Sequence, residues 1–131
     1  MPLKQIVSAA FFAASLMAGT AAPAATTGPY AEQGFTASQL LGKPILVHVT
    51  APWCPTCKQQ YPLLSKLEQG AEYKDLMVYD VDFDSQKDVL RKMHVTSQST
   101  LIVYQGGQEK IRSTDETDPV KIAGLLEQAN K

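Results

Sequence analysis

Apolar residues recur along this chain at the spacings of strands and helices. Residues 45–50 form a continuous apolar run around one histidine, which is the pattern of a strand covered on both faces. Residues 58–67 then carry leucines at helical spacing, and residues 76–82 alternate between apolar and polar positions. We therefore predict a buried strand, a helix and a second strand, the unit from which parallel sheets are built.

The second half of the chain continues with helices and a hairpin. The pattern predicts a helix over 86–93 capped by Asp84-Ser85, a strand over 100–104, a turn at Gly106-Gly107, a returning strand over 109–112, and a helix from Asp118-Pro119 to about Asn130. Parallel strands joined by helices, with an antiparallel edge, indicate a single-domain α/β fold. We expect a central mixed sheet of four or five strands flanked by helices.

The first 25 residues have a different character. Lys4 precedes an apolar stretch over 6–19, and small residues follow as far as Ala25. This is the layout of a cleavable signal peptide (residues 1–25), with cleavage between Ala22 and Ala25. The alternative is a membrane anchor, but an apolar run of about 14 residues is shorter than the roughly 20 that span a bilayer.

Residues 26–131 are expected to form the folded domain. Within it, residues 26–33 are polar and are interpreted as a leader without regular structure. A short helix is predicted over 35–41, with three apolar residues on one shared face: Phe35, Leu40 and Leu41.

Charge does not favour a polyanionic partner. The chain has 12 basic and 13 acidic residues, and loss of Lys4 with the leader leaves 11 and 13. Neither sign is clustered, so we expect no binding to nucleic acid or to an anionic membrane surface. A domain of this size can bury a modest core without structural disulfides.

The only two cysteines, Cys54 and Cys57, stand between a predicted strand and a predicted helix. A Cys-x-x-Cys in this place is typical of a redox pair. Backbone N–H groups and the dipole at the helix N-terminus favour a thiolate on Cys54, which we predict to be the nucleophile. Cys57, one turn in and less exposed, would resolve the mixed disulfide. The alternatives are an inert reduced pair or half of a zinc site, which lacks a second Cys or His pair here.

The chain resembles the thioredoxin family over nearly all of the predicted domain. The residues that carry the resemblance are Trp53-Cys54-Pro55-Thr56-Cys57-Lys58, Pro62, Asp80-Val81-Asp82, Thr100-Leu101-Ile102-Val103-Tyr104 and Gly106-Gly107. The resemblance implies a thioredoxin-like fold and thiol–disulfide exchange with protein disulfides or dithiols. It implies no bound cofactor and no metal.

Departures from the family pattern near the expected site include Ser99, His48 and Asp80, and Thr50 where the family usually has an aromatic residue. Ser99 stands where the family has a cis-proline, so we expect a trans peptide bond and altered substrate docking there. His48 replaces the family's buried acid, and Asp80 replaces a nearby lysine. His48 is interpreted either as a neutral core residue or as a base that takes the proton of Cys57, with Asp80 to orient it.

The residues beside the cysteines are expected to tune the pair. Pro55 and Thr56 set the energy of the thiolate, and a proline directly after the first cysteine resembles glutaredoxins and periplasmic oxidases. That feature favours a less reducing Cys54–Cys57 couple. Trp53 is interpreted as a cover over the sulfurs and a contact for substrate, or as simple packing.

These features together predict a periplasmic thiol–disulfide oxidoreductase that exchanges or reduces protein disulfides. The domain lacks the inserted helical region of the large periplasmic oxidases, which leaves little surface for holding unfolded chains, so we favour a reductant. We expect a monomer that a membrane electron donor keeps reduced. One alternative is binding or carriage of a soft metal such as copper by the dithiol, with His48 as a further ligand. A third hypothesis is a redox-silent protein that uses the fold for docking.

Overall fold

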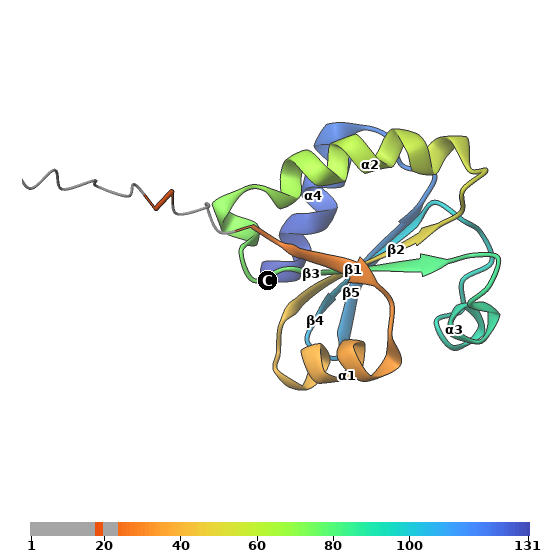
Figure 1. The fold of residues 1–131 in the computed structure, drawn as a ribbon, viewed down its shortest axis with the longest axis horizontal. Helices are drawn as coiled ribbons and strands as arrows, with labels where there is room; N and C mark the ends of the chain where they lie inside the picture. The colour runs from red at the N-terminus through yellow and green to blue at the C-terminus, as the bar shows by residue number, and fades with distance from the viewer. Residues whose placement is uncertain (1–17, 20–23) are drawn as a thin grey trace, which may run out of the picture.

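The computed structural model describes residues 18–19 and 24–131 (Figure 1). The predicted signal peptide, residues 1–25, lies almost entirely outside the described residues, so its cleavage stays a prediction. Across the two described ranges, no helix is both long and apolar enough to cross a membrane. Ala25 already belongs to the folded part, because its N–H donates to the carbonyl of Glu68 at 2.9 Å.

Five strands of the described residues form one mixed sheet in the order β1-β3-β2-β4-β5. They are β1 (Thr26–Pro29), β2 (Pro44–Thr50), β3 (Met77–Asp82), β4 (Thr100–Gln105) and β5 (Gln108–Thr114). Strands β1, β3 and β2 run parallel, whereas β4 is antiparallel to β2 and β5 is antiparallel to β4. The predicted mixed sheet is therefore confirmed.

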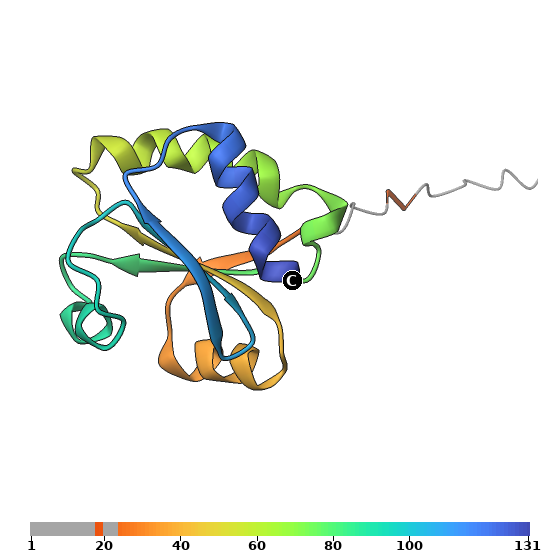
Figure 2. The same cartoon turned by 180° about the vertical axis from the view of Figure 1, so that it is seen from behind.

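Helices cover both faces of this sheet. They are α1 (Glu32–Leu40), α2 (Pro55–Glu68), α3 (Lys87–Lys92) and α4 (Pro119–Glu127), with short 3-10 turns η1 (Ala71–Tyr73) and η2 (Gln128–Asn130). Figures 1 and 2 show α2 and α4 on one face of the sheet and α1 and α3 on the other. The result is a three-layer α/β domain, as predicted.

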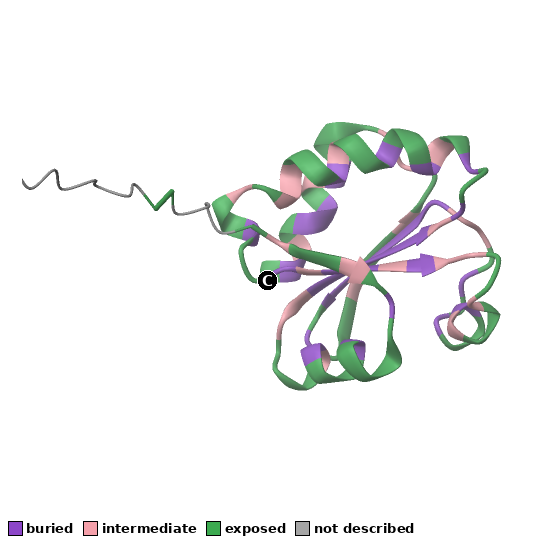
Figure 3. Cartoon of the chain, viewed as in Figure 1, coloured by how far each residue is buried: buried purple, intermediate pink, exposed green. Residues whose placement is uncertain are grey.

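Each face of the sheet has its own apolar core. The core under α1 and α3 includes Ile45, Val47, Val49, Phe35 and Leu90. The core under α2 and α4 includes Leu46, Leu64, Ile122 and Leu126. Figure 3 shows that buried residues concentrate in the strands and on the inner sides of the helices. Because side chains alternate along a strand, His48 falls on the face of β2 that α2 covers.

The segment expected to be an unstructured leader is partly a strand. Thr26–Pro29 form β1 at the sheet edge, paired in parallel with β3. Three of these four residues are exposed, so the strand has no alternating apolar pattern. Main-chain hydrogen bonds to β3 hold it instead, and they leave no signal in the sequence.

Helix α1 exists, but its predicted apolar face is wrong. Leu40 and Leu41 are 85% and 73% exposed, while the buried residues of the helix are Phe35 and Ser38. The hydroxyl of Ser38 shares a hydrogen bond of 2.7 Å with the hydroxyl of Tyr79. Residues three apart share a helix face, so a face through Phe35 and Ser38 turns Leu40 outward.

Of the two predicted helix caps, one is confirmed and the other is wrong. Asp118 caps α4 as predicted, because its carboxylate accepts from the N–H groups of Val120 and Lys121. Before α3, however, Asp84 and Ser85 do not act as the cap. Asp82 instead accepts from both of their N–H groups, at 2.9 and 2.7 Å. Hydrogen bonds from Ser85 are the main cause that lowers the pKa of Asp82.

The turn between β4 and β5 requires glycine at Gly106. Its φ is +56°, and its N–H donates to the carbonyl of Lys43 at 2.8 Å. A Cβ on Gly106 would lie 3.2 Å from Cα of Gly42 and 3.3 Å from the carbonyl oxygen of Gln39. A Cβ on the neighbouring Gly107 would meet nothing within 4 Å.

We expect Gly106→Ala to lower the free energy of unfolding by about 1–2 kcal/mol or more, because an L-residue resists a left-handed φ. Gly107→Ala is the matched control and should cost clearly less. Urea denaturation of the two variants provides the measurement. Equal losses in both would show that the close approach at Gly106 does not constrain the turn.

Candidate active site

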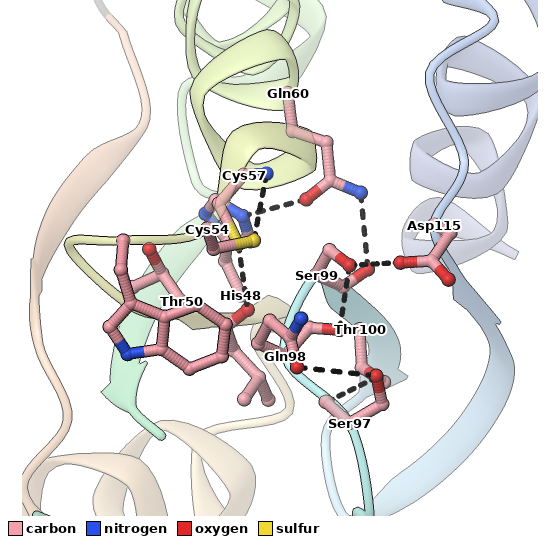
Figure 4. Close-up of a disulfide and its surroundings, with 12 residues drawn as sticks. His48, Thr50, Cys54, Cys57, Gln60, Ser97, Gln98, Ser99, Thr100 and Asp115 are labelled. Carbon is pink, nitrogen blue, oxygen red and sulfur yellow. Dashed lines mark hydrogen bonds between the residues drawn. A yellow bond between two sulfur atoms is a disulfide. The ribbon is translucent and has the colours of Figure 1, made fainter. Parts of the chain in front are cut away.

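Cys54 and Cys57 form a disulfide at the start of helix α2 (Figure 4). Cys54 is the N-cap residue with an extended backbone, and Pro55 takes the first helical position. The sulfur of Cys54 accepts a hydrogen bond from the N–H of Cys57, with an N to Sγ distance of 3.1 Å. A thiolate on Cys54 would therefore accept a hydrogen bond from a backbone N–H that has no partner within the helix. It would also lie at the positive end of the helix dipole.

The disulfide is covered by its neighbours. Cys54 and Cys57 are both 0% exposed, so the predicted difference in exposure between them is absent in this form. The reason is that the Cys54 sulfur turns inward to Cys57 and the pair packs against Ala51 and the half-buried Phe83. An attacking thiol therefore reaches the pair only when these neighbours move.

The side chain of Trp53 contacts the loop that follows β3. Its indole N–H donates to the carboxylate of Asp84 at 2.8 Å, and its ring packs edge-on against Phe83 with 6.3 Å between centroids. The side chain is 54% exposed, so it remains available to a partner. The predicted cover over the sulfurs stays a prediction, as does tuning by Pro55, which is exposed, and Thr56, which is half-buried.

His48 is buried between the sheet and helix α2. Its Nδ1 lies 3.4 Å from Oδ1 of Asp80, which is the residue paired with it in β3. Its Nε2 lies 3.0 Å from Oε1 of Gln60, and its ring packs edge-on against Tyr61. The expected contact with Asp80 is therefore present. The role of His48 as a base for Cys57 stays a prediction.

Gln60 is a site residue that the sequence analysis missed. It is 0% exposed and lies on the inner face of α2, between Cys57 and Leu64. Its amide nitrogen donates to the carbonyls of Ser99 at 3.1 Å and Glu116 at 3.0 Å. The spacing of Cys57, Gln60 and Leu64 could have revealed it, because a polar residue within a buried stripe must find partners.

Ser99 lies directly before β4 and is fully buried with φ +55°. Its N–H donates to the carbonyl of Val49 at 2.8 Å, and Sγ of Cys57 lies 3.8 Å from that same oxygen. Its hydroxyl contacts the carbonyl of Gln98 and the carboxylate of Asp115. No peptide bond of the described residues is cis, so the expected trans bond is confirmed. Proline would fit poorly here because it lacks the N–H and holds φ near −65°.

A cavity of about 260 Å³ lies beside His48 and is lined in part by Asp80, Glu68, Tyr61 and Thr27. Burial raises the pKa of the Glu68 carboxyl, and the negative charge of Asp80 adds to this effect. A hydrogen bond of 3.0 Å from the Thr27 hydroxyl opposes it. The cavity therefore brings titratable groups of α2 and β3 next to the buried imidazole.

The partners of His48 do not favour the copper alternative. Both ring nitrogens face other side chains, Gln60 and Asp80, rather than the sulfurs. Within the part of the chain that the structure describes, no group of three or more His, Cys, Asp or Glu side chains is arranged to hold a metal ion.

Curated proteins similar to this chain are thioredoxins. Thioredoxin-2 of Saccharomyces cerevisiae is 39% identical over 70 residues, which cover 53% of this chain and 65% of the yeast protein. The mitochondrial thioredoxin O1 of Arabidopsis thaliana is 30% identical over 90 residues, which cover 67% of this chain and 45% of that protein. The chain thus spans less than two thirds of the length of either relative.

Solved structures and a family model extend the match. The crystal structure of Trxlp from Edwardsiella tarda is 44% identical with a TM-score of 0.76, covering 77% of this chain and 98% of the other. That of thioredoxin O2 from Arabidopsis thaliana is 25% identical with a TM-score of 0.67, covering 83% and 96%. The family model described as Thioredoxin matches residues 30–128. With this match over most of the folded domain, the chain belongs to the thioredoxin family.

Proposed function

We propose that this protein is a thiol–disulfide oxidoreductase that reduces or exchanges disulfides in other proteins. The observation that carries the proposal is the position of Cys54, which caps helix α2 and is bonded to Cys57 in a chain of the thioredoxin family. Such a pair can accept or donate two electrons by moving between dithiol and disulfide. The protein acts as a monomer and needs no bound cofactor.

The reaction begins with the reduced pair. The Cys54 thiolate attacks one sulfur of a substrate disulfide, and the other substrate sulfur leaves as a thiolate that takes up a proton. Cys57 then loses its proton and attacks the sulfur of Cys54, which releases the second substrate thiol. Two electrons have passed to the substrate, and the protein holds the Cys54–Cys57 disulfide seen here.

His48 is proposed as the group that takes the proton of Cys57 in the second step, through one intervening water, because its ring nitrogens face Gln60 and Asp80 rather than the sulfurs. It is the buried imidazole on the α2 face of β2, and Asp80 lies against its Nδ1. A positioned base of this kind accelerates proton transfer. Trp53 is proposed to contact the substrate, since it precedes Cys54 and is 54% exposed. Ser99 is fully buried, so it is proposed to tune the pair through the carbonyl of Val49, which its N–H shares with the sulfur of Cys57.

The protein is further proposed to act in the periplasm as a reductant. Residues 1–25 support export because they have the layout of a signal peptide. A pair that reduces substrates must itself be reduced again after each cycle. We propose that a membrane electron donor supplies these electrons to the periplasmic protein. The absence of an inserted helical region in the described domain supports a reductant rather than a general oxidase.

The two cysteines should behave differently when each is replaced. Cys57→Ser is expected to accumulate a mixed disulfide through Cys54 with a model substrate such as insulin, because the resolving thiol is gone. Cys54→Ser is the matched control and should trap no substrate, and neither variant should turn over. Mass spectrometry of the protein after alkylation provides the measurement. Trapping by Cys54→Ser would assign the nucleophile to Cys57 instead.

Replacement of His48 should slow only the second step. We expect His48→Asn to slow release of the mixed disulfide by about 100-fold, because asparagine keeps hydrogen bonds but cannot accept the proton. Alkylation of Cys54 should remain largely unchanged. The other histidine, His94, is exposed, and His94→Asn serves as the control. Release at the wild-type rate in His48→Asn would remove the base from the mechanism.

Location and electron source can be measured together. The full chain, expressed in a bacterium with a periplasm, is expected in the periplasmic fraction with a new N-terminus between Ala22 and Ala25. Alkylation in intact cells should find Cys54 and Cys57 reduced. A chain that starts at Thr26 after a new Met is the control and should stay in the cytoplasm. Unprocessed protein in the cytoplasm contradicts export, and a fully oxidised pair in the periplasm contradicts the reductant role.

A further inference from the structure

The amide of Gln60 can take only one orientation. Its Nε2 faces the carbonyl oxygens of Ser99 and Glu116, at 3.1 and 3.0 Å. A carbonyl oxygen accepts and never donates, so an amide turned by 180° would place its own oxygen against two other oxygens. The side chain is 0% exposed, so bulk solvent does not reach it to replace the lost hydrogen bonds. The oxygen of Gln60 must therefore point to His48, as Figure 4 shows.

This orientation determines which nitrogen of His48 carries a proton. Oε1 of Gln60 lies 3.0 Å from Nε2 of His48 and can only accept a hydrogen bond. A bare Nε2 would leave two lone pairs facing each other in a buried site. His48 therefore holds a proton on Nε2, and Nδ1 is the nitrogen that can gain or lose one.

The free nitrogen faces Asp80 and the cavity rather than Gln60. Nδ1 lies 3.4 Å from the carboxylate of Asp80, which is 28% exposed. A proton on Nδ1 would form a charge-assisted pair with that carboxylate. The other titratable groups on this side come from α2: the carboxyl of Glu68 across the cavity and the hydroxyl of Tyr61, whose ring packs on the imidazole.

We propose that Gln60 is a positioning residue that holds His48 with its proton on Nε2 and leaves Nδ1, beside Asp80 and the cavity, as the only site of proton exchange. This inference rests on the proposed function and refines it. If His48 takes the proton of Cys57, that proton ends on Nδ1. Gln60 also ties the imidazole to the backbone at Ser99, because one amide bridges the two.

The test reads the protonation of each ring nitrogen directly. In the oxidised mature protein labelled with ¹⁵N, we expect the signal of Nε2 of His48 to be that of a protonated nitrogen at every pH at which the protein is folded. Any signal that changes with pH should belong to Nδ1. The His94→Asn variant assigns the spectrum, because only His48 then remains. A bare Nε2 with a proton on Nδ1 in the wild-type protein would overturn the proposal without any variant at Gln60.

Two substitutions separate the acceptor from the two donors of Gln60. Gln60→Glu keeps an oxygen for His48 and should keep the Nε2 proton, with its second carboxyl oxygen protonated to donate to one of the two backbone carbonyls. Gln60→Leu offers no acceptor, so the proton of His48 should no longer be confined to Nε2. Gln59→Leu is the matched control on the exposed side of α2 and should change nothing. An unchanged His48 spectrum in Gln60→Leu, or the same loss in Gln60→Glu, would contradict the proposal.

Kinetics separate this inference from the proposed function. Release of the mixed disulfide should slow by about tenfold in Gln60→Leu relative to Gln59→Leu, which corresponds to the loss of one hydrogen bond in the transition state. Release in Gln60→Leu at the rate of Gln59→Leu would count against a positioning role. If even the wild-type protein exchanges no disulfides, the proposed function fails, while the spectrum of His48 still decides the role of Gln60.

Discussion

Burial of polar side chains under helix α2 constrains the whole site. An unpartnered buried donor or acceptor costs about 1–3 kcal/mol, and within residues 18–19 and 24–131 no buried side-chain nitrogen or oxygen lacks a partner. Gln60 meets this requirement with three hydrogen bonds. They reach β2, the backbone before β4 and the segment before α4, so one side chain of α2 holds three distant parts of the chain in register.

The redox pair depends on the same junction between β2 and α2. The strand brings Cys54 to the helix N-terminus, where its sulfur takes the place of a capping oxygen and receives the N–H of Cys57. The carbonyl of Val49 in β2 accepts the N–H of Ser99 and also lies 3.8 Å from the sulfur of Cys57. Helix, strand and the residue before β4 therefore meet within one hydrogen-bond network.

Much of the fold could be predicted because its elements carry strong periodic signals. The apolar run of β2, the turn at Gly106 and the cap at Asp118 each have a local physical cause, and all are present. The edge strand β1 could not be predicted, because main-chain pairing to β3 holds it and its residues are mostly exposed. The predicted apolar face of α1 was wrong because Ser38, rather than the leucines, turns inward and hydrogen-bonds to Tyr79.

The sequence by itself determined the two cysteines at the start of a helix, since their spacing and the flanking strand are local features. It also identified His48, Asp80 and Ser99 as departures from a family pattern. Only the tertiary structure decided how they connect. Gln60 joins His48 to Ser99 although these residues are far apart in the chain. Hydrogen bonds between distant segments depend on packing of the sheet against α2, and no spacing along the chain records that packing.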